Sequence, residues 1–193
     1  MANPAAAGSV RVKDYGISMT LPAIPLWVPD QARRTLNDLV LATMRLALQE
    51  AAGHISDEAP RDSGGLAQSF GANPATTTGG MELMGVDTTA GVTGRVFSTL
   101  PQAVVMDQGR RAGAPISRAG IDAIGLWAQR KLKLSAQDAD HAKWAIASSI
   151  VAHGLVGTGY FDKGVKAAEP RIEMMFQILG RNITQALQTE GAR

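Results

Sequence analysis

The stretch DQARRTLNDLVLATMRLALQEAAGHI, residues 30–55, decides the fold. Its apolar side chains recur every three or four positions, which is the spacing of one buried stripe along an amphipathic helix. The stripe is made of Leu36, Leu39, Val40, Met44, Ala47, Leu48, Ala51 and Ile55. Asp30 is expected to cap the start of this helix, and Pro60 lies beyond its end. The sequence therefore predicts one long helix close to the N-terminus.

Short segments with strand character follow the helix. They lie at about residues 81–86, 93–98 and 103–106 and are separated by Gly, Thr and Asp. In the turn-rich segment before them, Leu66 and Phe70 are placed to anchor one helical turn. The spacing of the three segments predicts a small antiparallel sheet.

Two helices are expected after the loop 109–115. Ser117 is predicted to cap the first, which ends near Leu134. Ser135 is predicted to cap the second, which ends at His153. Apolar or small residues mark one face of each helix: Ile121, Ile124 and Trp127 in the first, and Ala139, Ala142, Ala145 or Ile146, Ser149 and Ile150 in the second.

The Gly-rich stretch 154–159 separates these helices from the last one. We interpret it as a turn between helices, in which glycine supplies positive φ angles. The last helix is predicted to start near Phe161, and Pro170 either kinks it or opens its second half at the first turn. The order of helix, small sheet and further helices predicts an α+β domain over residues 30–193.

The N-terminal residues 1–29 are predicted to form an extended arm without a helix. Prolines at positions 22, 25 and 29 fix φ and remove hydrogen-bond donors, and residues 10–12 have strand character. The arm is also apolar, with Leu26 and Trp27 near its end. An apolar arm must be buried, either against its own domain or against a neighbouring subunit.

The composition limits the classes of function. The chain has 193 residues, of which 45% are hydrophobic, enough for the core of one domain. Lys+Arg 19 against Asp+Glu 17 gives a net charge of +2, too balanced for a protein that coats nucleic acid by charge alone. Cysteine is absent, which excludes disulfides, thiolate metal ligands and cysteine nucleophiles. Neither a signal peptide nor an apolar run of about 20 residues is recognisable, so we expect no membrane partner.

The residue types that carry catalysis are scattered along the chain. His54, His141 and His153 stand at no metal-ligand spacing. The Gly-x-x-Gly-x-Gly pattern of residues 154–159 follows a predicted helix, whereas a dinucleotide-binding loop must follow a strand. Neither a Walker motif nor a Gly-x-Ser-x-Gly elbow is present. We therefore expect that the protein is not an enzyme and uses no cofactor and no metal.

Two groups of cationic residues are candidates for contacts. Arg110, Arg111 and Arg118 flank a Gly/Pro loop, from which they could reach DNA phosphates or acidic surfaces of another subunit. The second group lies at a predicted helix C-terminus, where cations complement the helix dipole. It consists of Arg130, Lys131 and Lys133.

Three segments carry a resemblance to a known family. APRDSGGLAQSF, residues 59–70, combines Ala-Pro with an acidic residue, Ser, Gly, Leu and a Ser-hydrophobe pair. PQAVVMDQGR, residues 101–110, ends in an acidic residue, a spacer, Gly and a basic residue. GLVGTGYF, residues 154–161, is a late Gly-rich turn that leads through an aromatic residue into the last helix. In this order, and over about residues 31–190, they resemble the tail-component family of long-tailed bacteriophages, which includes tail-completion and neck proteins.

The resemblance implies a structural virion protein that completes the tail or joins head and tail at the neck. Such subunits assemble into rings; a hexamer would match the tail tube, and a dodecamer would match the portal side. The implied partners are further copies of the chain, the connector or stopper proteins and the tail tube, reached through Leu26, Trp27 or Arg118. Passing contact with genomic DNA would involve Arg110 or Arg111. The implied location is the virion, with assembly in the host cytoplasm.

One alternative stays open beside the neck assignment. The loop that holds Arg110 and Arg111 could instead serve a nucleic-acid-binding protein.

Overall fold

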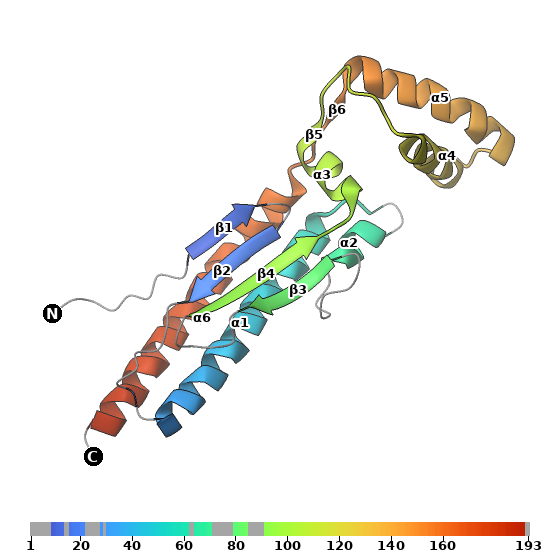
Figure 1. Ribbon diagram of the computed structural model, residues 1–193. Coiled ribbons are helices and arrows are strands. Elements are labelled where there is room, and N and C mark those ends of the chain that lie inside the picture. The colour runs from blue at the N-terminus through green and yellow to red at the C-terminus, as the bar shows by residue number, and fades with distance from the viewer. Residues whose placement is uncertain are drawn as a thin grey trace.

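The computed structural model describes residues 9–13, 16–21, 28, 30–61, 64–70, 79–84 and 91–191. They form a two-layer body, in which a four-stranded antiparallel sheet lies on two long helices, and a helical hairpin that projects from one end of the body (Figure 1). The predicted α+β class is confirmed, with its long first helix, small antiparallel sheet and C-terminal helices.

The sheet has the strand order β1-β2-β4-β3, and all neighbours are antiparallel. Its strands are β1 (Ser9–Lys13), β2 (Gly16–Leu21), β3 (Gly79–Met84) and β4 (Val92–Ser98). The register pairs Ile17 with Val96 and Leu21 with Val92, and all four side chains are buried. One face of the sheet therefore carries the core, as alternation of buried and exposed positions requires. The strands predicted at 81–86 and 93–98 are confirmed as β3 and β4, except that residues 85–86 lie outside the described ranges.

The helix layer consists of α1 (Asp30–Glu58) and α6 (Tyr160–Gly191). The predicted apolar stripe of α1 is buried, apart from Leu39, which is half-buried and packs against the core. The sheet makes room for this stripe at Gly94, where a β-carbon would come within 2.8 Å of the Leu48 side chain. The last helix is continuous through Pro170, so the alternative of a second helix starting there is wrong.

The two long helices run antiparallel and approach closely at a glycine. A β-carbon on Gly164 would lie 2.6 Å from Cα of Ile55, so only glycine allows this backbone-to-backbone contact. Farther along, the Arg171 guanidinium lies 3.2 Å from a carboxylate oxygen of Glu50. These contacts fix which residues of α1 lie beside which residues of α6.

The segment predicted as a strand at 103–106 is part of a helix instead. Helix α3 (Pro101–Gln108) starts with Pro101 in its first turn, and the preceding Leu100 has an extended backbone. Proline suits this position because the first amides of a helix have no partner within it. Ala103 is fully buried, and Gly109 ends the helix with a φ of 81°. A short apolar run such as Ala-Val-Val-Met fits a buried strand and a short helix equally well, and here Pro101 at the first position favours the helix.

The hairpin is formed by α4 (Arg118–Leu132) and α5 (Ala136–His153). Both predicted caps are present, since Ser117 Oγ accepts from the amide of Gly120 at 3.2 Å and Ser135 Oγ accepts from the amide of Asp138 at 3.1 Å. A two-stranded ribbon joins the hairpin to the body through β5 (Gly109–Arg110) and β6 (Leu155–Val156). The chain thus leaves and re-enters the body at one point.

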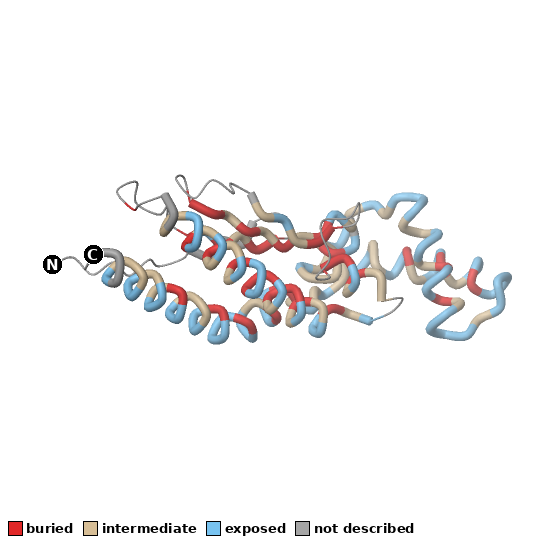
Figure 2. Tube along the Cα trace, turned by 90° about the horizontal axis from the view of Figure 1, so that it is seen from below, coloured by how far each residue is buried: buried red, intermediate tan, exposed pale blue. Residues whose placement is uncertain are grey.

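The hairpin has almost no core of its own. Its buried residues are small or polar: Gly125, Ala128, Ala139, Lys143 and Ala147. The hydrophobic core lies entirely in the body, and Figure 2 shows the hairpin largely exposed beyond it. A helical hairpin with so little buried apolar surface depends on its attachment to the body and on further contacts.

The N-terminal segment differs from the predicted arm. Residues 10–12 are in a strand as predicted, but β1 and β2 together form half of the sheet. Met19 is fully buried and Val28 is 1% exposed. Of the two alternatives for this apolar segment, burial against the chain's own domain holds for Val28 and the apolar residues of β2, which complete the inner face of the sheet.

A separate helical turn, α2 (Gly65–Ser69), follows α1 as predicted. Leu66 and Phe70 are its buried anchors, and Gly64 precedes it with a φ of 76°. Among the described residues, no helix combines the length and the apolar character that crossing a membrane requires.

Candidate functional site

The three segments that carry the family resemblance meet at one place, where the hairpin joins the body. Phe70, from the first segment, contacts Tyr160 with ring centroids 6.0 Å apart and Phe161 with centroids 5.9 Å apart. The Tyr160 hydroxyl donates to the carbonyl oxygen of Ala103, in the second segment, at 3.3 Å. All four residues are buried. We call this region the joint; it contains residues 59–61, 64–70, 101–110 and 154–161.

Asp107 is the central polar residue of the joint. Its carboxylate accepts from the amide of Phe161 at 2.8 Å, and its carbonyl accepts from the amide of Gly159 at 3.0 Å. Thr158 donates its amide and its hydroxyl to the carbonyl of Met106, both at 2.9 Å. A carboxylate at the start of a helix satisfies free amides and favours the helix dipole. Asp107 therefore ties the end of α3 to the start of α6.

Glycines allow two stretches of backbone to cross within the joint. A β-carbon on Gly157 would lie 2.2 Å from the carbonyl oxygen of Asp107, and one on Gly109 would lie 2.3 Å from that of Leu155. Gly154, with a φ of 78°, would bring a β-carbon within 2.5 Å of the Arg110 carbonyl. The predicted positive φ angles are confirmed at Gly154 and Gly159. Between them, residues 155–156 form strand β6, and Gly157 allows a close backbone contact that the sequence did not reveal.

Arg110 and Arg111, predicted as neighbouring contacts, have different surroundings. Arg110 donates from its guanidinium to the carbonyl oxygens of Ala114, at 3.1 Å, and Pro115. It thereby braces the loop before α4, and its half-buried side chain does not present a free cation to DNA. Arg111 is exposed on the same loop. Arg110 is thus engaged within its own loop, whereas the Arg111 side chain is exposed.

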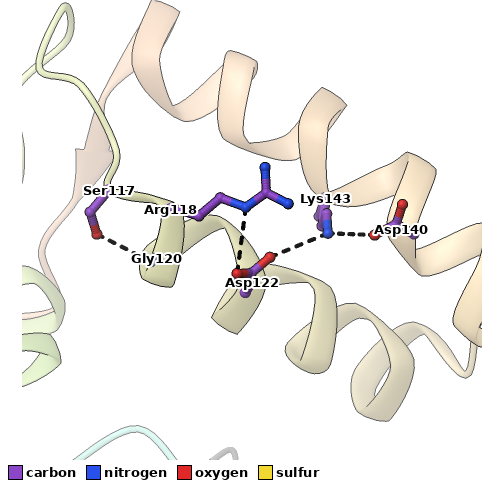
Figure 3. Close-up of polar contacts among 6 residues, drawn as sticks. All are labelled: Ser117, Arg118, Gly120, Asp122, Asp140 and Lys143. Carbon is purple, nitrogen blue, oxygen red and sulfur yellow. Dashed lines mark hydrogen bonds and ion pairs between the residues drawn. The ribbon is translucent and has the colours of Figure 1, made fainter.

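Arg118 belongs to a chain of charges that joins the two hairpin helices (Figure 3). Its guanidinium lies 3.6 Å from one carboxylate oxygen of Asp122, and Lys143 lies 3.3 Å from the other. Lys143 also pairs with Asp140, so it links a carboxylate of α4 to one of α5. The Lys143 side chain is only 10% exposed, and a cation this far from solvent needs carboxylate partners.

Both members of the closest pair have shifted pKa values. The hydrogen bond from Lys143 and the charge of its ammonium lower the pKa of the Asp140 carboxyl below 3.8. The hydrogen bond to Asp140 raises the pKa of the Lys143 ammonium above 10.5. Each shift favours the charged form, so the pair within α5 stays ionised near neutral pH, and the contact of Lys143 with Asp122 is the one that crosses to α4.

Large apolar side chains are exposed on the hairpin, contrary to the expectation from sequence. Trp127, predicted on the apolar face of its helix, is 38% exposed, and Trp144 is 45% exposed. The Arg118 guanidinium lies 5.3 Å from the Trp144 ring centroid, a cation–π contact. Leu126 and Leu132 are also about half exposed. The hairpin is therefore a candidate interaction surface.

Leu26 and Trp27, predicted as contacts to a neighbouring subunit, lie outside the described residues. The cations at the end of α4 are exposed, and Lys131 donates to the carbonyl oxygen of Arg61, 3.3 Å away, at the end of α1. This contact joins the tip region of the hairpin to the body.

The histidines remain apart. His54 lies 3.3 Å from Glu50, and Nδ1 of His153 lies 3.1 Å from the carbonyl oxygen of Ser149. Within the described part of the chain, no group of three or more His, Cys, Asp or Glu side chains is placed to hold a metal ion. The arrangement can therefore make contacts with other macromolecules, and we identify no catalytic constellation in it.

No known protein family, curated protein or solved structure matches the chain.

Proposed function

We propose that the protein is a structural, non-enzymatic subunit of the neck of a long-tailed bacteriophage, where it completes the tail or joins head and tail as a ring. The observation that carries this proposal is the joint. Three segments that lie far apart in the sequence, and that resemble the tail-component family one by one, pack against one another around Phe70, Asp107 and Tyr160. Their order and spacing thus have a common structural reason.

The projecting hairpin is a second support. A subunit that assembles with others needs surfaces that reach beyond its own core, and the hairpin offers exposed Leu and Trp side chains on a firmly attached base. The hydrogen bond from the Gly113 amide to the carbonyl oxygen of Val151, at 2.7 Å, adds to this attachment. A projecting hairpin with exposed apolar side chains suits a subunit that assembles by binding its neighbours.

The alternative of a nucleic-acid-binding protein has less support. It relied on Arg110 and Arg111 together, and Arg110 is engaged with two carbonyl oxygens of its own loop. A salt-sensitive shift of DNA at micromolar protein, lost in Arg111→Ala and kept in the exposed control Arg45→Ala, would favour this alternative over the neck.

The test of the proposal is the assembly state of the purified protein. Mass photometry across a concentration series, combined with negative-stain images, should show closed rings, with six subunits for a tail-side ring or twelve for a portal-side ring. Addition to isolated tails or filled heads should then incorporate the protein. A monomer that joins neither tails nor heads would contradict the proposal.

A further inference from the structure

The exposed large apolar side chains fall into two patches on different parts of the molecule. Among the residues that the structure describes, they are Leu46, Leu126, Trp127, Leu132, Trp144, Val156, Met174 and Ile178. Four belong to the hairpin and one to the ribbon at its base, whereas three belong to the helix layer of the body. None lies on β2 or β4 of the sheet.

The first patch is a stripe on α4 that points away from α5. Ala123, Leu126, Trp127 and Arg130 follow the spacing i, i+3, i+4, i+7, and all four are exposed. This is the pattern by which an amphipathic helix binds a partner, and it comes in addition to the buried side of α4 at Gly125 and Ala128. We call it the α4 stripe.

The second patch lies on the helix layer, on the side away from the sheet. The pair of Arg171 with Glu50 places Met174, three residues farther along α6, beside Leu46, four residues earlier on α1. Ile178 follows Met174 by one turn of α6. The three side chains are 58%, 54% and 44% exposed for Met174, Leu46 and Ile178. We call this surface the helix-layer patch.

The two patches belong to parts of the chain with opposite net charge. The hairpin, residues 118–153, carries five Lys and Arg against three Asp and Glu, a net charge of +2. The helix α1 carries three against five, a net charge of −2, while α6 is balanced with four of each. Beside the helix-layer patch itself, exposed Glu173 adjoins Met174, and Arg171, one turn before Met174, is paired with Glu50. A cationic hairpin and an anionic helix layer attract each other when they belong to different molecules.

We propose that the α4 stripe of one copy of this chain docks on the helix-layer patch of the next copy. The inference rests on the self-assembly in the proposed function and names the surfaces through which it proceeds. Each copy holds both patches at separate places, so it contacts one neighbour through its hairpin and another through its helix layer. Such heterologous contacts close into a ring when the rotation between copies is right. The contact would also bury Leu126 and Trp127, which are exposed in the single chain.

Cysteine cross-linking tests this pairing directly, because the natural chain contains no cysteine. The variants Leu126→Cys and Ile178→Cys are purified separately, mixed, and treated with a short bismaleimide. The mixture should give covalent dimers, and neither variant alone should give them, because the contact joins two different surfaces. A mixture of Leu126→Cys with Thr20→Cys, an exposed position on the sheet, is the matched control and should stay unlinked.

Substitution of the patches gives a second readout. Leu126→Glu and Ile178→Glu should each raise the concentration at half assembly by about tenfold or more, since each removes an apolar contact from the same interface. Their thermal midpoints should stay close to that of the natural chain, because both side chains are largely exposed in the monomer. Ser148→Glu, at an exposed site on α5, should leave assembly unchanged.

Three results would overturn the pairing, and they separate it from the proposed function. Dimers of Leu126→Cys alone would mean that hairpins pair with each other. Rings without cross-links in the mixture would place the contact elsewhere and leave the neck proposal standing. A monomer at all concentrations would refute the self-contact, and its incorporation into tails or heads would then decide the neck proposal separately.

Discussion

The contact of Gly164 with α1 allows a sharp test of how the two long helices pack. A β-carbon at this position would lie 2.6 Å from Cα and 2.7 Å from the amide nitrogen of Ile55. Both are backbone atoms, so no rotamer change relieves the clash. Alanine would force α1 and α6 apart by roughly 1 Å, the difference from an ordinary contact, at a cost of about 1–3 kcal/mol.

Gly180 provides a matched control on the same helix. Nothing lies within 4 Å of a β-carbon built there. Gly180→Ala should therefore stabilise the protein by about 0.5–1 kcal/mol, because alanine loses less backbone entropy in a helix than glycine. Gly164→Ala gains the same stabilisation from helix propensity, but its β-carbon also collides with the backbone of Ile55. We expect its free energy of unfolding to lie about 1–3 kcal/mol below that of Gly180→Ala.

Urea unfolding followed by far-ultraviolet circular dichroism measures both variants against the natural chain. Protein concentrations must be equal, because self-assembly would shift the apparent stability. Equal stabilisation by the two substitutions, with equal m-values, would refute the reasoning, since it would mean that the helices do not meet backbone to backbone at Gly164.

Three further predictions concern the joint and the hairpin. Asp107→Ala should lower the free energy of unfolding by about 0.5–2 kcal/mol because it removes the cap of α6, and urea unfolding measures the loss. Ser135→Ala should cost about 1 kcal/mol at the start of α5, seen as faster amide exchange in the hairpin than in the body. Because its pKa is lowered in the folded state, Asp140 stabilises the hairpin above about pH 3.8, and this contribution is lost as the pH falls through the lowered pKa. Lys143, whose pKa is raised, contributes to stability below about pH 10.5, and its contribution is lost as the pH rises through the raised pKa. Fluorescence of Trp144, with the other tryptophans replaced by Phe, should report the loss of stability at both the acid and the alkaline end.

Most of the architecture follows from patterns in the sequence. The stripe of the first helix has a period that only a helix satisfies, and Ser117 and Ser135 mark the starts of the hairpin helices through local chemistry. Residues 101–108 escaped prediction because their apolar run is too short to show a period. There the proline at the helix start was the stronger signal.

The candidate site was less predictable, because its properties depend on contacts between distant segments. Two adjacent arginines suggest one cationic patch, yet the path of the loop turns Arg110 towards carbonyl oxygens and leaves Arg111 exposed. Trp127 follows the apolar period of its helix, but α4 packs on α5 through Gly125 and Ala128, and Trp127, on another side of α4, stays 38% exposed. The role of Asp107 as the cap of α6 joins residues 54 positions apart, which no local pattern reveals.

The ribbon at the base of the hairpin has a consequence for how such a protein can vary. Arg110 and Leu155 are paired neighbours, so the hairpin between them can change in length without altering the path of the body, at the loss of the contact between Lys131 and Arg61. One added turn in each hairpin helix would extend the reach by about 5.4 Å, and α5, with 18 residues, already spans about 27 Å. The length of the hairpin thus sets how far the subunit reaches from its body. Lineages or designers can reset its span to a new spacing between subunits while the sheet and the long helices stay the same.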